Sequence, residues 1–205
     1  IYLKHNSKPN LYVSIGDGLI NRLASRNVVE SQSLCERIDG RLVRGQVTTD
    51  TLVTINLNED PNQVNAEIQL TGGLSSATYI QQGKIRAYVN TAGAVSGTRS
   101  IYANLGGFFA VDPNVDASVA ACFNGTSSKL RVVDCIAEKK FDKEKCKSEA
   151  SATLRAKNET LTRFTEQTDE AISDGREKLS ESREKMRAKS NLIPEIYLRS
   201  FDDSV

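Results

Sequence analysis

The feature that most constrains this chain is a run from residue 136 to residue 190 that is dense in Lys, Glu, Arg, Ala and Ser and contains no proline. These residues are mostly strong helix formers, and the larger apolar side chains among them recur in steps close to three, four or seven. The pattern therefore predicts a long C-terminal helix, residues 136–191, with one apolar stripe and an opposite face in water. The stripe consists of Leu154, Leu161, Phe164, Ala171, Ile172, Leu179 and Met186.

The length of this helix is itself informative. The 55 residues from 136 to 190 would extend for roughly 80 Å at the helical rise, whereas a compact domain of this chain length is only about 40 to 45 Å across. The helix is therefore expected to overhang its domain, to be covered by another chain, or to break. Ser173, Asp174 and Gly175 are the predicted site of a kink or break, because an interior glycine costs about 1 kcal/mol relative to alanine and Ser and Asp compete for backbone groups.

The sequence before the helix has the period of β-strands. From residue 38 to residue 111, apolar and polar residues alternate, which is typical of antiparallel strands with one apolar face and one wet face. Turn residues at 60–62, 72–73, 82–83, 93 and 106–107 divide this region into about five strands of a meander. The apolar face requires a cover, and the striped helix is the obvious candidate.

The remaining elements complete an α+β fold: an antiparallel β-sheet (meander) packed on a long C-terminal helix, with a short N-terminal helix after Asp17. We expect a β-rich domain over residues 1–135, the helix over residues 136–191 and a returning strand over residues 192–205. Further strands are predicted at 11–15, 117–123 and 130–133, the last two joined by a turn at Asn124 and Gly125.

Four cysteines, in an even number and without a C-x-x-C pair, argue against a zinc knuckle and a thioredoxin-like site and favour disulfides. They are Cys35, Cys122, Cys135 and Cys146. Pairing of Cys122 with Cys135 is the preferred interpretation, since a hairpin turn at Asn124 and Gly125 would bring them together. The alternative is a set of buried free thiols in a reducing compartment.

Charge and hydropathy exclude some partners. A net charge of +1 gives no overall field for nucleic acid, although a small total can hide local patches. No apolar run is long enough for a transmembrane helix, and the first residues do not form a signal peptide. The chain does not begin with Met, which fits a processed or truncated product. Alternating charges along the helix are typical of a solvated face and not of a nucleic-acid interface.

No motif predicts a catalytic, cofactor-binding or metal site. His5 is the only histidine, so histidine-based metal sites and a well-placed serine triad are disfavoured. Asp112, Asn114 and Asp116 resemble the start of a calcium loop, but Ala117 and Phe123 occupy the positions that require Gly and Glu. Carboxylate pairs such as Glu59 with Asp60, or Glu36 with Asp39, are too common to identify an enzyme.

The order of elements, together with three segments, resembles a family of large, exported bacterial proteins of unknown function. The segments are residues 38–45 leading into Thr49 and Thr51, residues 58–62 followed by 66–72, and the long helix closed by Ile193, Pro194 and Glu195. The resemblance implies an extracytoplasmic location, periplasmic or secreted, and a chain that continues beyond Val205. It transfers no catalytic residue.

Three classes of function remain. The first is a non-enzymatic structural or protein-interaction module whose partners are other protein chains, the remainder of a longer polypeptide or a second copy. The second is a carrier that binds a lipid or another apolar ligand between sheet and helix, which predicts an apolar groove of several hundred Å³. The third is a hydrolase that uses a carboxylate pair. The absence of a catalytic motif favours the first class.

Overall fold

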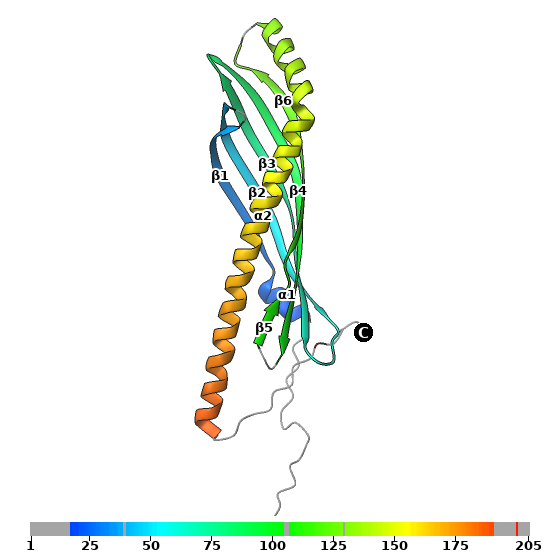
Figure 1. Cartoon of the computed structure of the whole chain (residues 1–205), viewed down its shortest axis with the longest axis vertical. Coiled ribbons are helices and arrows are strands. Elements are labelled where there is room, and N and C mark those ends of the chain that lie inside the picture. The colour runs from blue at the N-terminus through cyan, green and yellow to red at the C-terminus, as the bar shows by residue number, and fades with distance from the viewer. Residues whose placement is uncertain (1–16, 39, 105–106, 129, 191–199, 201–205) are drawn as a thin grey trace, which may run out of the picture.

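A computed structural model describes residues 17–38, 40–104, 107–128, 130–190 and 200 (Figure 1). It confirms the predicted α+β class, with an antiparallel sheet followed by a long helix that packs on it. The elements in chain order are α1 (Asp17–Ala24), β1 (Arg26–Ile38), β2 (Arg41–Asn58), β3 (Val64–Gln82), β4 (Ile85–Asn104), β5 (Gly107–Ala110), β6 (Asn114–Thr126) and α2 (Arg131–Ser190).

The sheet is a meander in the order β1-β2-β3-β4-β5, and β6 pairs with β4 beyond the short β5. The three central strands are 18, 19 and 20 residues long, several times the usual length of about five or six. β4 therefore extends for roughly 60 Å. Figure 1 shows these strands curving around α2 as a half-barrel.

The predicted turns at residues 72–73 and at residue 93 are wrong, because Gly72 and Gly93 lie inside β3 and β4. They serve the curvature of the sheet. A Cβ atom on Gly93 would lie 2.2 Å from the carbonyl oxygen of Ser118, and one on Gly72 would lie 2.4 Å from that of Asp50. Only glycine permits such close approach between neighbouring strands, so the sequence supplies glycine where the strands coil most tightly.

The long helix covers the concave face of the sheet, as predicted. It contacts β6 most extensively, and it also contacts β4 and β5. Apolar side chains at alternate strand positions point toward it and form the core together with Phe164 of α2. The buried members of this core are Ile68, Leu70, Val95, Val115 and Phe164.

α2 begins at Arg131, five residues before the predicted start, so the strand predicted at 130–133 is wrong. Asp134 explains the early start. It lies in the first turn, where a negative charge interacts favourably with the positive end of the helix dipole and stabilises the helix. Its Oδ1 atom also accepts hydrogen bonds from the backbone N–H of Thr126 at 3.0 Å and from the Thr126 hydroxyl at 2.6 Å.

The predicted break near Gly175 is also wrong, since α2 is one uninterrupted helix of 60 residues. Gly175 faces the ring of Phe108 in β5, and a Cβ atom there would lie 3.6 Å from that ring. The glycine thus provides a flat surface for packing between the helix and β5. Figure 1 shows the last part of α2 extending past the end of the sheet, which is the overhang expected from its length.

Both chain ends lie mostly outside the described residues, including the strand predicted at 11–15. The returning strand predicted over residues 192–205 is described only at Ser200. That residue forms an isolated antiparallel bridge with Asp60, between β2 and β3. The backbone N–H of each donates to the carbonyl oxygen of the other at 3.1 Å.

The predicted disulfides are absent. Cys35, Cys122, Cys135 and Cys146 are all free and exposed, so they are not buried thiols either. The preferred pair fails because β6 continues through Asn124 and Gly125 instead of turning. Cys122 alternates with inward-facing residues and lies on the convex side of β6, whereas Cys135 belongs to the helix that covers the concave side.

Candidate site: an apolar groove between the sheet and the helix

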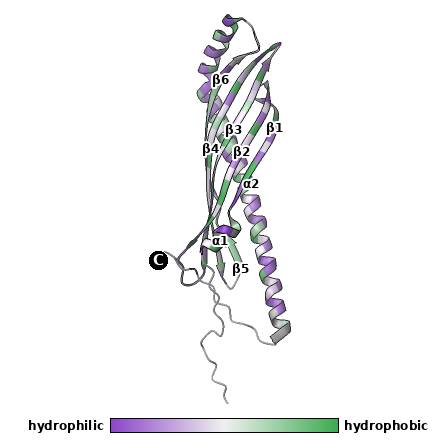
Figure 2. Ribbon diagram, turned by 180° about the vertical axis from the view of Figure 1, so that it is seen from behind, coloured by the Kyte–Doolittle hydropathy of each residue, from purple (hydrophilic) through white to green (hydrophobic). Residues whose placement is uncertain are grey.

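A groove of about 800 Å³ lies between the concave face of the sheet and α2. Its walls come from every long strand and from the first two thirds of the helix. Figure 2 shows apolar and polar residues alternating along these strands, and it is the inward-facing set that lines the groove. The apolar lining includes Val28, Leu34, Val43, Val47, Val53, Leu70, Leu74, Ile80, Val89, Val95, Val119, Ala121, Phe123, Ala152 and Ala156.

Hydroxyl groups are the main polar component of the floor. Thr49, Thr51, Ser76, Thr78 and Thr91 line the groove alongside the apolar residues. Some of these hydroxyls already have partners within the sheet. The Ser76 and Thr91 hydroxyls lie 2.7 Å apart, and the Thr78 hydroxyl donates to the carbonyl oxygen of Val89 at 3.0 Å. Hydroxyls that already have hydrogen-bond partners in the sheet need none from a ligand. The sheet side of the groove can therefore contact an apolar chain.

The groove is closed at the end nearer β5 by Phe164. Its side chain is buried, and it reaches Gly97 of β4, where a Cβ atom would lie 3.5 Å from the ring. Leu161 packs against the same core. The helix therefore fits tightly on the sheet at this level. Further toward the N-terminus of α2 the helix stays against β6, and the groove separates it from the other long strands.

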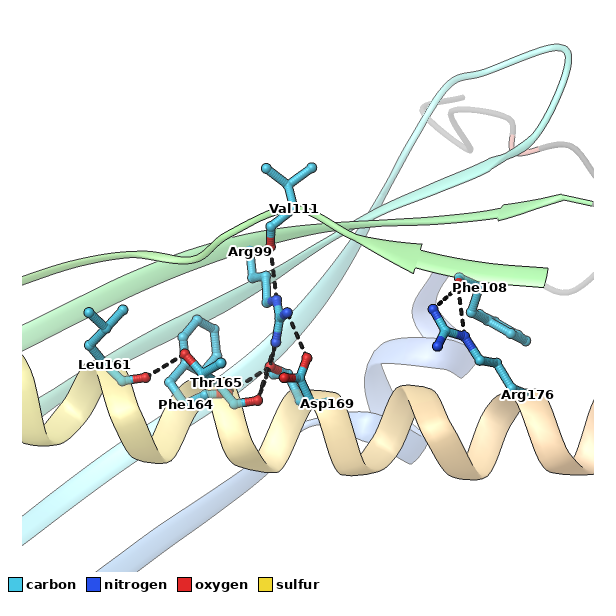
Figure 3. Close-up of polar contacts among 9 residues, drawn as sticks. Arg99, Phe108, Val111, Leu161, Phe164, Thr165, Asp169 and Arg176 are labelled. Carbon is cyan, nitrogen blue, oxygen red and sulfur yellow. Dashed lines mark hydrogen bonds and ion pairs between the residues drawn. The ribbon is translucent and has the colours of Figure 1, made fainter. Parts of the chain in front are cut away.

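At this closed end of the groove, Arg99 links the sheet to α2 (Figure 3). It is buried in β4, and its Nε donates to the carbonyl oxygen of Val111 at 2.9 Å. Its other nitrogens reach α2, where one donates to the Thr165 carbonyl oxygen at 3.2 Å and to the Thr168 hydroxyl, and another forms an ion pair with Asp169 at 2.7 Å. One guanidinium thus joins the sheet to a full turn of the helix.

A second contact of this kind lies further along α2. Arg176 donates two hydrogen bonds to the carbonyl oxygen of Phe108 in β5, at 2.9 and 2.5 Å (Figure 3). It is exposed, in contrast to Arg99.

Side chains of α2 also satisfy the free edge of β6. The backbone N–H of Val119 donates to the hydroxyl of Thr153 at 3.1 Å, and that of Ala121 donates to the carboxylate of Glu149 at 2.8 Å. Together with the Thr126 contact to Asp134, these bonds occupy edge donors that would otherwise be open to another strand.

The opposite side of the groove, at β1, is joined to α2 by ion pairs between long side chains. Arg163 pairs with Glu30 at 2.5 Å and also donates to Gln32 at 3.0 Å, and Arg155 pairs with Glu36. We call these β1 contacts, together with the Arg41 pair described next, the rim ion pairs.

The third rim ion pair joins β2 to α2. Arg41 binds the carboxylate of Glu144 through two nitrogens, at 2.7 and 3.2 Å. This hydrogen bonding by the guanidinium lowers the pKa of Glu144 below its ordinary value. The side chains are partly exposed, so water screens the pair and its contribution to stability is small.

The predicted stripe on the helix is only partly an interface with the sheet. Phe164 and Ile172 are buried, and Leu161 and Leu179 are half-buried. Leu154 is 59% exposed and Ala171 is exposed, so these two residues of the stripe do not pack on this sheet. The side chain of Met186 lies outside the described part of the chain.

The carboxylates considered as acid–base pairs have structural partners. Asp60 accepts hydrogen bonds from the backbone N–H of Asn62 at 2.9 Å and from the Gln63 amide at 3.0 Å, which lower its pKa. Glu36 is bound to Arg155. Within the described residues no cluster of His, Cys, Asp and Glu could hold a metal ion, and none of the described helices is apolar over a length that would cross a membrane.

Sequence reasoning missed the residues that hold α2 in place. Thr168 accepts a hydrogen bond from Arg99, and Gly175, which was predicted as a break in the helix, packs on Phe108. Arg99 carried a detectable signal, because it occupies an inward position between Gly97 and Ile101 in an alternating strand. Thr153 and Glu149 carried none, since exposed Thr and Glu are ordinary on a helix.

Comparisons with protein-family models, curated proteins and solved structures gave no significant match to this chain.

Proposed function

We propose that this chain is a non-enzymatic binding module, located outside the cytoplasm, that carries an acyl chain or a similar apolar chain in the groove between the sheet and α2. The single observation that supports this proposal most strongly is the groove itself. Its volume of about 800 Å³ lies within the range of roughly 300 to 1,000 Å³ that is typical of ligand sites with mostly apolar walls. The extracytoplasmic location rests on the family resemblance.

The shape of the groove favours an extended ligand. Its lining follows β4 from Val95 to Ile85, a distance of roughly 30 Å at the strand rise. A compact ligand would leave most of this length empty, whereas an acyl chain can follow it. The buried Phe164 closes one end, so the chain would lie with its tail toward that residue.

We expect binding of saturated fatty acids to strengthen with chain length. Each added methylene that enters the groove contributes about 0.8 kcal/mol, so two more carbons should tighten binding by roughly tenfold until the groove is full. Displacement of a fluorescent acyl probe by fatty acids of 10 to 18 carbons measures this series. Native mass spectrometry of the purified chain reports any acyl ligand that co-purifies.

The change Ala152→Trp places a large ring in the groove and should weaken acyl binding at least tenfold, because it removes space that the chain needs. Ala150→Trp is the matched control, since Ala150 is two residues away on an exposed position of the same helix. Equal affinities in the two variants, or an affinity that does not depend on chain length, would exclude the groove as the binding site.

A second candidate is the interaction module. It is supported by the overhang of α2 past the sheet (Figure 1) and by the exposed apolar residues Leu154 and Val29. The mass of the assembly in the same native spectra distinguishes the two functions, since a carrier needs no second protein chain whereas an interaction module forms a complex.

A further inference from the structure

We propose that one end of the molecule docks on the surface of an anionic lipid bilayer, with the mouth of the groove facing the lipid. This end, which we call the tip, comprises the β1–β2 turn, the β3–β4 turn, the segment after β6 and the start of α2. Its described residues are 36–38, 40–44, 79–88, 126–128 and 130–144. The docking is argued from the exposed side chains and the charge of the tip. Only its purpose, which is access of acyl chains to the groove, rests on the proposed function.

Backbone and side-chain contacts bring the tip segments together. The backbone N–H of Ser127 donates to the carbonyl oxygen of Arg86 at 2.8 Å, and that of Arg86 donates to the Ser127 hydroxyl at 2.9 Å. The pair between Arg41 and Glu144 adds the β1–β2 turn. Figure 1 shows the β3–β4 turn and the start of α2 at the same end of the molecule.

The tip exposes four large apolar side chains. Ile85 is 42%, Leu130 67%, Val132 70% and Ile136 64% exposed. Ile85 and Ile136 also line the groove, so the exposed apolar surface is continuous with the interior of the groove. Apolar side chains at the end of a protein, flanked by basic ones, are the usual means by which a peripheral protein inserts into the boundary between head groups and acyl chains.

Positive charge is concentrated at the same end. The described residues of the tip contain nine Lys and Arg against five Asp and Glu, a net charge of +4, whereas the whole chain has a net charge of +1. The remainder of the chain is therefore net negative. This asymmetry gives the tip complementarity to an anionic surface and orients the rest of the molecule away from it.

The combination favours a bilayer over a protein as the partner. A bilayer is the source of acyl chains, and a groove whose mouth lies among inserted apolar side chains lets a chain enter without crossing water. The cost of moving each methylene through water is about 0.8 kcal/mol, so direct contact between mouth and lipid removes the main barrier to loading.

The test is flotation of the whole chain with vesicles of two compositions. We expect binding to phosphatidylglycerol–phosphatidylethanolamine vesicles that weakens with salt, and little binding to phosphatidylcholine vesicles. The double variant Leu130→Ser with Val132→Ser should bind at least about tenfold more weakly, because it removes inserted apolar surface. Lys84→Gln and Arg131→Gln should each weaken binding by about fivefold.

Leu154→Ser is the matched control, since Leu154 is similarly exposed on α2 but lies outside the tip; it should float like the unaltered chain. Acyl-probe binding without vesicles should be unchanged in all these variants, which shows that they fold. Failure of the unaltered chain to float with anionic vesicles, or equal flotation of the Leu130/Val132 variant, would overturn the docking proposal. If the chain floats but binds no acyl probe, docking stands and the carrier function fails.

Discussion

At the scale of single residues, Arg99 is the side chain on which the position of the helix depends most. This buried cation of β4 contacts both α2 and the segment between β5 and β6. Its partners are two carbonyl oxygens, one hydroxyl and one carboxylate. The carboxylate of Asp169 is 58% exposed, so water already compensates for part of its charge. The Thr168 hydroxyl is buried and has no such compensation.

We therefore expect Arg99→Met to destabilise the protein by about 2 to 4 kcal/mol, because it removes the donor to one buried hydroxyl and two part-buried carbonyl oxygens while it keeps much of the apolar stem. Arg176→Met removes comparable bonds at an exposed position and should cost less than about 1 kcal/mol. Urea unfolding followed by circular dichroism measures both. Equal midpoints for the two variants would show that Arg99 does not anchor the helix.

At the scale of elements, the pairing of β6 with α2 solves the problem of an open sheet edge. Residues on the helix accept hydrogen bonds from the alternate N–H groups that β6 does not present to β4. The edge is thereby closed to strand addition, and α2 is aligned along β6 over several turns. This alignment sets the width of the groove, because the opposite wall at β1 is reached only across the groove.

Thr153→Val tests this alignment with almost no change of shape. The N–H of Val119 would lose its acceptor, so its hydrogen exchange should accelerate by about fivefold to tenfold for a lost bond of roughly 1 kcal/mol. The amides of Ser118 and Ala120, which alternate with it, should change much less. Thr162→Val is a control at an exposed position of α2, and a similar acceleration of Val119 in that variant would contradict the assignment.

At the scale of the whole molecule, the half-barrel depends on glycines inside the strands. Gly45, Gly72 and Gly93 lie on the inward face of three successive strands, and at each of them a Cβ atom would overlap the backbone of a neighbouring strand. A flat sheet of the same strands would leave α2 with a single line of contact and no enclosed space. The groove is thus a product of curvature, which in turn requires these glycines.

Gly93→Ala should cost at least about 2 kcal/mol, since the neighbouring strand must move to relieve the overlap. It should also weaken acyl binding through the altered curvature. Gly73→Ala is a stringent control, because Gly73 lies in β3 but a Cβ atom there meets nothing closer than 3.8 Å. A change within about 0.5 kcal/mol is expected for it, and comparable losses in the two variants would refute the role assigned to Gly93.

The sequence was sufficient to predict the meander and its helical cover, because both follow from periodicity, which is local. It misassigned Gly72 and Gly93 as turns, since a glycine that permits close approach of strands has the same local signal as one that permits a turn. The start of α2 was missed because Val132 and Val133 favour strands, whereas the contact of Asp134 with Thr126 favours the helix. The groove, the rim ion pairs and the tip depend on residues far apart in sequence, so the local periodicity of the sequence does not predict their geometry.

The unequal attachment of α2 has a mechanical consequence. Along β6 the helix is fixed by backbone donors, whereas along β1 it is held by the ion pairs of Arg155 and Arg163, which are partly exposed and therefore screened by water. Moving the N-terminal part of α2 away from β1 would separate those pairs, while Arg99 and Phe164 keep the helix on the sheet at the closed end of the groove. The width of the groove on its β1 side therefore depends on weak, screened contacts and can change without breaking any strand pairing of the sheet.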